Sequence, residues 1–111
     1  MPTTFQDREK AFEAKFAHDE ELRFLALARR DKFFAHWAAE RLRLSKEATE
    51  ILVKEVLAIP NGPRHDRALL DHIATFFSTQ GAAVSGGELT AALGEAMKRT
   101  LEQFAEAPPH Y

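Results

Sequence analysis

From Thr3 to Ile59 the chain contains neither glycine nor proline, although its 111 residues include five of each. Alanine, glutamate, lysine, arginine and leucine dominate this stretch, and all five residue types favour helix. Because no strong helix breaker interrupts the stretch, capping residues must set where its helices begin and end. No segment of the chain alternates steadily between apolar and polar residues, so we expect no strands.

The apolar pattern predicts an all-α fold, a four-helix bundle. Its first helix, from about residue 20 to 44, is apolar on more than one side, which is typical of a helix at the centre of a bundle. Its apolar residues are Leu22, Phe24, Leu25, Leu27, Phe33, Phe34, Trp37 and Leu42. The other three are expected at about 46–58, at 64–79, and from residue 86 to the Pro108–Pro109 pair. Their predicted core residues are Ile51, Leu52, Val56, Ile59, Leu69, Leu70, Ile73, Phe76, Phe77, Leu89, Leu93, Ala96, Met97, Leu101 and Phe104. Short connections between these helices indicate antiparallel neighbours.

Local signals mark the helix ends. Asp19 and Ser45 are candidate N-caps, and Ser85 with Glu88 has the spacing of a capping box. Residues 60–63, Pro-Asn-Gly-Pro, predict a firm stop and turn, and Gly81 fits a C-terminal cap. Either the first helix runs through residues 18–21 or a new helix starts there. A restart is preferred, since one helix of about 40 residues would be ~60 Å long.

The N-terminal segment differs from the rest of the chain. Phe5, Phe12 and Phe16 lie at i, i+7 and i+11, within a narrow arc of a helix, and most other side chains are charged or small. Two interpretations follow: the three phenylalanines cover part of the bundle core, or they anchor a mobile arm in the groove of a partner. The residues alone leave both open. The predicted organisation is an arm at 1–18, a bundle at 19–107 and a tail at 108–111.

Composition excludes several classes of function. The chain has no cysteine, which rules out disulfides, cysteine-ligated metals and thiol catalysis. Fifteen basic and 17 acidic residues give a net charge of −2, without the basic footprint of a nucleic-acid binder. The apolar runs are far shorter than the ~20 residues that cross a bilayer, so we expect no direct membrane insertion. The first residues lack the apolar core of a signal peptide, which predicts a cytoplasmic location.

Candidate chemistry is sparse. His65 and His72 lie seven apart with Asp66 and Asp71 nearby, but the i, i+4 histidine pair that one helix presents to zinc is missing. We therefore interpret both histidines as surface or boundary side chains. The Arg29–Arg30 and Lys98–Arg99 pairs are interpreted as solvated helix faces, with contact to a phosphate or to an acidic partner as the alternative. Trp37 is interpreted as a buried residue. No serine has a context that would activate it, so the sequence does not indicate an enzyme.

Residues 3–44 then provide a resemblance, in the stretch TTFQDREKAFEAKFAHDEELRFLALARRDKFFAHWAAERLRL. This block closely resembles the N-terminal half of the ζ-subunit family, small inhibitors of the F1FO-ATP synthase of α-proteobacteria. Beyond Leu44 mainly the length and the helix layout agree. Leu25 stands where the family usually has Lys, Asp31 where it has Asn, and Phe33–Phe34 where it has Leu. We interpret these as repacking and surface changes.

The resemblance implies a regulatory inhibitor and not an enzyme. Its N-terminal segment would insert into a catalytic interface of the F1 sector, next to the rotor, and block rotation in the hydrolytic direction. The chain would be a monomer when free and would act at the periphery of the inner membrane. The implied F1-binding residues are Phe5, Asp7, Arg8, Glu9, Lys10, Phe12, Glu13, Lys15 and Phe16. No cofactor is required, but ADP or ATP is implied as a possible regulatory ligand, with no signature that places its site. The alternative is a nucleotide-responsive helical sensor or adaptor without inhibitory activity.

Overall fold

The computed structural model describes residues 19–106, and this part of the chain consists of four helices with no strand. The helices are α2 (Glu20–Leu42), α3 (Lys46–Leu57), α4 (His65–Thr79) and α5 (Gly86–Glu106). The predicted all-α fold is confirmed, and each helix lies within two residues of its expected bounds. The predicted arm at 1–18 and the tail at 108–111 lie outside the described residues.

Helix α2 begins where the sequence predicted a restart. Asp19 has extended backbone angles, and its carboxylate accepts a hydrogen bond from the backbone N–H of Leu22 at 2.9 Å. Glu20 and Glu21 follow in the first turn, where the partial positive charge of the helix end favours acids. At its other end α2 stops at Arg43, which adopts the left-handed conformation with φ 55°. A three-residue connection then leads to α3.

The predicted caps of α3 and α5 are both formed. The Ser45 hydroxyl accepts from the N–H of Ala48 at 3.1 Å. At the start of α5 the Ser85 hydroxyl accepts from the N–H of Glu88 at 3.0 Å, while the Glu88 carboxylate accepts from the N–H of Ser85 at 3.3 Å. This reciprocal pair is the capping box that the spacing predicts.

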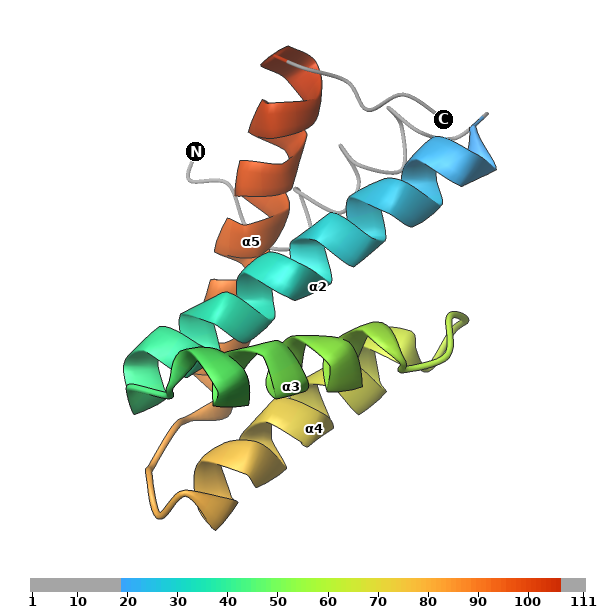
Figure 1. Ribbon diagram of the computed structural model, residues 1–111. Coiled ribbons are helices and arrows are strands. Elements are labelled where there is room, and N and C mark those ends of the chain that lie inside the picture. Colours follow the sequence, from blue (N-terminus) through green and yellow to red (C-terminus); the bar gives the residue numbers. More distant parts are fainter. Residues whose placement is uncertain (1–18, 107–111) are drawn as a thin grey trace.

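Glycine is required in both of the remaining connections. Gly62 has φ +136° between α3 and α4, and Gly81 has φ +72° after α4, values that side chains with a Cβ disfavour. In Figure 1, α3 doubles back along α2, α4 returns behind α3, and α5 crosses behind α2. The chain therefore winds three helices around the first.

Helix α2 is the centre of the bundle, and it packs against α3, α4 and α5. Much of its buried face is alanine, at positions 26, 35, 38 and 39. Small side chains let neighbouring helix backbones approach closely, which explains how one helix supports contacts on several sides. The central position predicted for this helix is confirmed.

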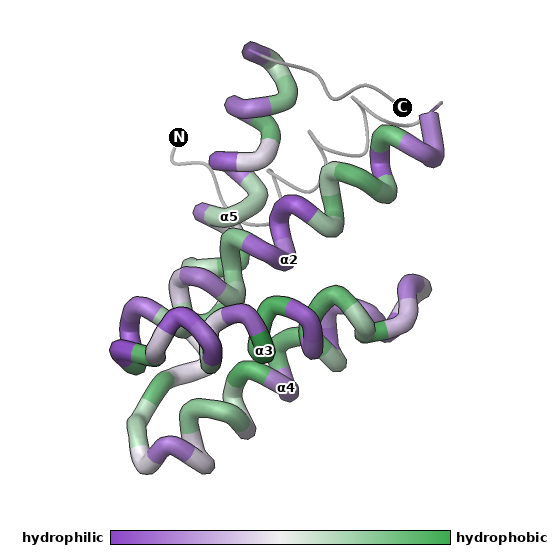
Figure 2. The backbone as a smooth tube through the Cα atoms, in the orientation of Figure 1, coloured by the Kyte–Doolittle hydropathy of each residue, from purple (hydrophilic) through white to green (hydrophobic). Residues whose placement is uncertain are grey.

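The main core lies between α2 and the other three helices, with Phe34, Leu52, Ile73, Phe77 and Leu93 among its buried members. A second cluster of Ala26, Met97 and Phe104 joins α2 to the C-terminal half of α5. Figure 2 shows hydrophobic and hydrophilic positions alternating around each helix, as expected when one face is buried. Every predicted core residue of α5 is at least partly buried.

Two apolar positions were assigned wrongly. Ile51 was predicted on the buried stripe of the second helix, but it is 58 % exposed. Each helical residue turns by ~100°, so Ile51 points well away from the side that Leu52 and Val56 share. Phe24, counted in the apolar pattern of α2, is 56 % exposed for the same kind of reason. Apolar residues in this chain outnumber its core positions.

Candidate functional site

All nine positions that the resemblance implies for binding F1 lie outside the described residues. They are Phe5, Asp7, Arg8, Glu9, Lys10, Phe12, Glu13, Lys15 and Phe16. The structure describes the point to which they connect, Asp19 and the first turn of α2. Within residues 19–106, two features combine polar chemistry with shape: a buried ionic cluster, and a groove between α2 and α5.

The buried cluster is centred on Arg30, whose side chain is 1 % exposed. Its Nε donates to Asp31 Oδ1 at 2.9 Å, and Nη1 and Nη2 donate to the two carboxylate oxygens of Asp66 on α4 at 3.3 and 2.7 Å. The interpretation of Arg30 as part of a solvated face is wrong. Two carboxylates meet the guanidinium inside the protein and replace the water that it loses.

Asp31 also contacts a histidine, which extends the cluster to His65. Its second oxygen, Oδ2, lies 2.6 Å from Nε2 of His65, and Nδ1 of the same ring lies 3.0 Å from the backbone carbonyl of Pro60. Asp31 is 2 % exposed and His65 is 7 % exposed, so the surface interpretation of both residues is wrong. The cluster joins α2, the α3–α4 connection and the start of α4.

Burial and the neighbouring carboxylates act on the pKa of Arg30 in opposite directions. Burial by itself lowers the pKa of the Arg30 guanidinium, because it penalises the charged form. The hydrogen bond to Asp66 and the negative charges of Asp31 and Asp66 outweigh burial, and the pKa of Arg30 is raised above its ordinary value. Arg30 is therefore a fixed cation inside the bundle.

The sequence carried a signal for this cluster that the motif search missed. The buried residues of α2 follow the series 26, 30, 31, 34, 35, 38, 39, a regular helical stripe. Arg30 and Asp31 occupy two places of that stripe. An acid and a base in phase with buried alanines and a phenylalanine predict a buried polar contact, although not its partners.

His65 and His72 do not come together as a metal site. His65 binds Asp31 and Pro60, whereas His72 Nε2 lies 3.0 Å from Glu55 Oε1 on α3, at the surface. No group of three or more metal-ligating side chains occurs within the described part of the chain. The boundary interpretation is confirmed for His72 alone.

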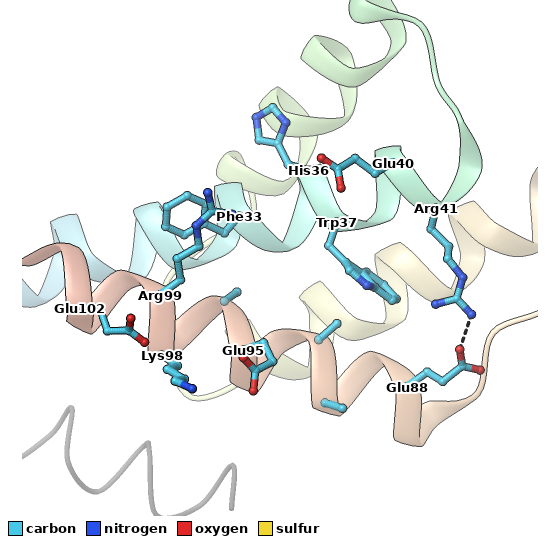
Figure 3. A pocket seen from close by; sticks show the side chains of 13 residues that line it. Phe33, His36, Trp37, Glu40, Arg41, Glu88, Glu95, Lys98, Arg99 and Glu102 are labelled. Carbon is cyan, nitrogen blue, oxygen red and sulfur yellow. Dashed lines mark hydrogen bonds and ion pairs between the residues drawn. The ribbon is translucent and has the colours of Figure 1, made fainter. Parts of the chain in front are cut away.

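The second feature is a groove of about 650 Å³ between α2 and α5 (Figure 3). Phe33 and Trp37 contribute its aromatic wall, and both are half-buried. Arg99 of α5 lies over the Phe33 ring, 4.5 Å from its centroid, and Arg41 lies 5.7 Å from the centroid of Trp37. Arg99 thus covers an aromatic ring instead of extending freely into solvent. The Trp37 ring also stacks on the buried Phe34 ring, with the two centroids 5.8 Å apart.

Charges along the groove are mixed. Arg41 forms an ion pair with Glu88, drawn in Figure 3, and this hydrogen bond is the main cause that lowers the pKa of Glu88 below its ordinary value. The groove is also lined by His36, Glu40, Glu95, Lys98 and Glu102. With four carboxylates against three cations beside a histidine, it lacks the surplus positive charge that a polyphosphate would require.

Comparison with known proteins assigns the chain. The family described as ATPase inhibitor subunit zeta matches residues 2–103. The chain belongs to this family. Searches of curated proteins and of solved structures found no match. The family resemblance drawn from residues 3–44 is thereby confirmed. The family match also covers the rest of the bundle, where the resemblance beyond Leu44 was limited to length and helix layout.

Membership in the zeta family indicates an inhibitor subunit of an ATPase, which is a regulatory role. The family name also implies that the partner is ATP synthase. None of the helices described in residues 19–106 combines the length and the apolar character needed to cross a membrane.

Proposed function

We propose that this zeta-family chain blocks ATP hydrolysis by inserting its N-terminal segment into a catalytic interface of the F1 sector. The observation that carries the proposal is the family match over residues 2–103, because it spans the predicted arm and the bundle together. In this proposal the chain is a cytoplasmic monomer when free. It becomes peripheral to the inner membrane when it binds the synthase, at the catalytic interface and the rotor.

The arm supplies the inhibitory contacts. Residues 5–17 become helical on binding, and Phe5, Phe12 and Phe16 bury against the catalytic subunits. Each fully buried apolar side chain contributes about 1.5–3 kcal/mol, whereas ordering costs about 1–2 kcal/mol for each backbone residue. Three phenylalanines therefore need polar partners. Charged neighbours provide register and specificity rather than bulk affinity: Asp7, Arg8, Glu9, Lys10, Glu13 and Lys15.

The bundle stops the arm from passing further into the interface. Support for this role comes from α2, which starts at its own cap and is held on several sides by α3, α4 and α5. A helix packed in this way presents a wide, fixed body behind a narrow segment. The bundle is too wide to follow the arm into the interface, so the inserted arm stays in place and blocks rotation in the hydrolytic direction.

The test is inhibition of ATP hydrolysis by purified F1 from an α-proteobacterium. The full chain is compared with the triple variant Phe5→Ala, Phe12→Ala and Phe16→Ala, and with Phe24→Ala as a matched control. We expect the triple variant to lose inhibition and Phe24→Ala, which removes an exposed ring of the bundle, to keep it. Circular dichroism checks that all three chains are equally helical. Inhibition by the triple variant at full strength would refute insertion of the arm.

Regulation by ADP or ATP stays a prediction. The α2–α5 groove has room for a ligand, about 650 Å³, but its mixed charge gives the nucleotide-sensor alternative no support. Calorimetric titration of the free chain with ADP and with ATP tests this directly. Saturable binding by a chain that does not inhibit F1 would favour the sensor over the inhibitor.

A further inference from the structure

The His65 ring lies between two hydrogen-bond acceptors. Asp31 Oδ2 faces Nε2 at 2.6 Å, and the Pro60 carbonyl faces Nδ1 at 3.0 Å. A carboxylate and a backbone carbonyl can accept hydrogen bonds but cannot donate them. Only the doubly protonated ring has an N–H for each side.

Loss of one proton therefore breaks one contact. A neutral imidazole has a single N–H, and its second nitrogen then directs a lone pair at an oxygen lone pair. The carboxylate of Asp31 is the stronger acceptor, because its hydrogen bond is charge-assisted and shorter. A neutral His65 keeps Asp31 and releases Pro60.

Groups around the ring both favour and oppose its positive charge. From α2, Asp31 favours the charge and Arg30 opposes it; Asp66, on the same helix as His65, favours it. With a protonated His65 the cluster of Arg30, Asp31, His65 and Asp66 has two positive and two negative groups, and balances. The positive end of α4 opposes protonation, because His65 is the first residue of that helix.

The other elements packed near the ring add little charge. A hollow beside it is lined by Glu20 and Arg23 of α2, which have opposite signs, and by Met97 of α5, which has none. Arg64 shares a second, smaller hollow with His65 on the side of the α3–α4 connection. The proton balance thus depends on the buried cluster and on Arg64.

We propose that His65 is a proton-controlled latch on the α3–α4 connection. The protonated ring ties Pro60 to Asp31 and so holds residues 60–63 against α2. Loss of the proton frees Pro60 and lets the connection move, which reshapes the hollow next to the exposed Phe24. The Pro60 contact is present while the ring carries both of its protons and is lost when one of them leaves.

The latch is tested by nuclear magnetic resonance on the full free chain, from about pH 5 to pH 8. The ring nitrogens of His65 report protonation, and the amides of Asn61 and Gly62 report the connection. Gly81, in the other glycine-containing connection, is the internal control. We expect the Asn61 and Gly62 signals to shift together with the His65 ring, while Gly81 stays in place.

Two variants separate the latch from a general effect of pH. His72→Gln removes a surface histidine that pairs with Glu55, and it should leave the Asn61 and Gly62 shifts unchanged. His65→Gln should abolish them. The latch is refuted if the His65 ring keeps one protonation state throughout, or if the connection shifts without it or equally in folded His65→Gln. Should His65→Gln fail to fold, the wild-type chain and His72→Gln decide between these outcomes.

Discussion

Helix α2 carries two arginines that each reach a carboxylate on another helix, in opposite surroundings. Arg30 binds Asp66 of α4 with a side chain that is 1 % exposed, and Arg41 binds Glu88 of α5 with one that is 48 % exposed. Water competes for the second pair and screens it, whereas the buried Arg30 guanidinium has no water to replace a lost partner. The difference teaches that burial, more than the types of residue in the pair, determines how strongly each arginine affects the stability of the fold.

The largest effect is expected from Arg30→Ala. It leaves Asp31 buried without its cation, and removing one member of a buried ion pair costs about 3–5 kcal/mol. Because Asp66 is partly exposed and can be rehydrated, we expect the lower end of that range. Urea unfolding measures the change in the free energy of unfolding. A loss no greater than that of Arg41→Ala would contradict the comparison.

Removing both charges on α2 should cost less than removing one. In the double variant Arg30→Met with Asp31→Leu, no unpaired charge remains on the buried stripe of α2. Replacing buried ion pairs by apolar residues is often neutral or stabilising. The free energy of unfolding of the double variant should therefore exceed that of Arg30→Ala by about 1 kcal/mol or more. The same urea titration checks this. Equal stability of the two variants would mean that lost packing, and not an unpaired charge, dominates.

A smaller effect is expected from Glu88→Gln at the exposed pair. Glutamine keeps the size of the side chain and its place in the capping box, so the substitution removes the charge alone. We expect a decrease in thermal stability that is smaller than that of Arg30→Ala and disappears at about 1 M salt, where the Debye length is ~3 Å. A decrease that persists in high salt would show that the pair is less screened than its exposure indicates.

The smallest effect is on acid stability. The pKa of Glu88 is lowered mainly by the hydrogen bond from Arg41, so its stabilising contribution is present above the unfolded pKa of about 4.3 and is lost as pH falls through the lower folded value. In Arg41→Gln the pKa of Glu88 should rise toward its ordinary value. A carboxyl titration followed by nuclear magnetic resonance checks this shift. An unchanged pKa would assign the lowering to the Ser85 cap instead.

Sequence reasoning was accurate where the signal is local. Asp19, Ser45 and the Ser85–Glu88 pair act within three residues of themselves, so the spacing alone identified them. The buried cluster depends on Arg30 meeting Asp66 and on Asp31 meeting His65, contacts that span 36 and 34 residues. No local pattern contains such a contact.

The phase of α2 would have placed Arg30 and Asp31 on the inner face, had the alanines been counted as core residues. Large apolar side chains such as Phe24 and Ile51 were weighted instead, and both are exposed. The arm shows a different limit. Its residues were singled out by the resemblance and by the phenylalanine spacing, and their role in binding F1 stays a prediction.

The N-cap at Asp19 has a mechanical consequence. Its extended backbone ends the helical rod, so a pull or twist applied to the preceding chain does not continue along an unbroken ladder of hydrogen bonds. Within the described residues the load enters α2 at Asp19, whose side chain accepts a hydrogen bond from the N–H of Leu22 and whose carbonyl accepts one from the N–H of Arg23 at 3.0 Å. Under load the first turn of α2 should yield before the central turns, which α3 and α5 clamp from either side. Opening of this first turn at Asp19 would then leave the packing of α2 against α3, α4 and α5 intact.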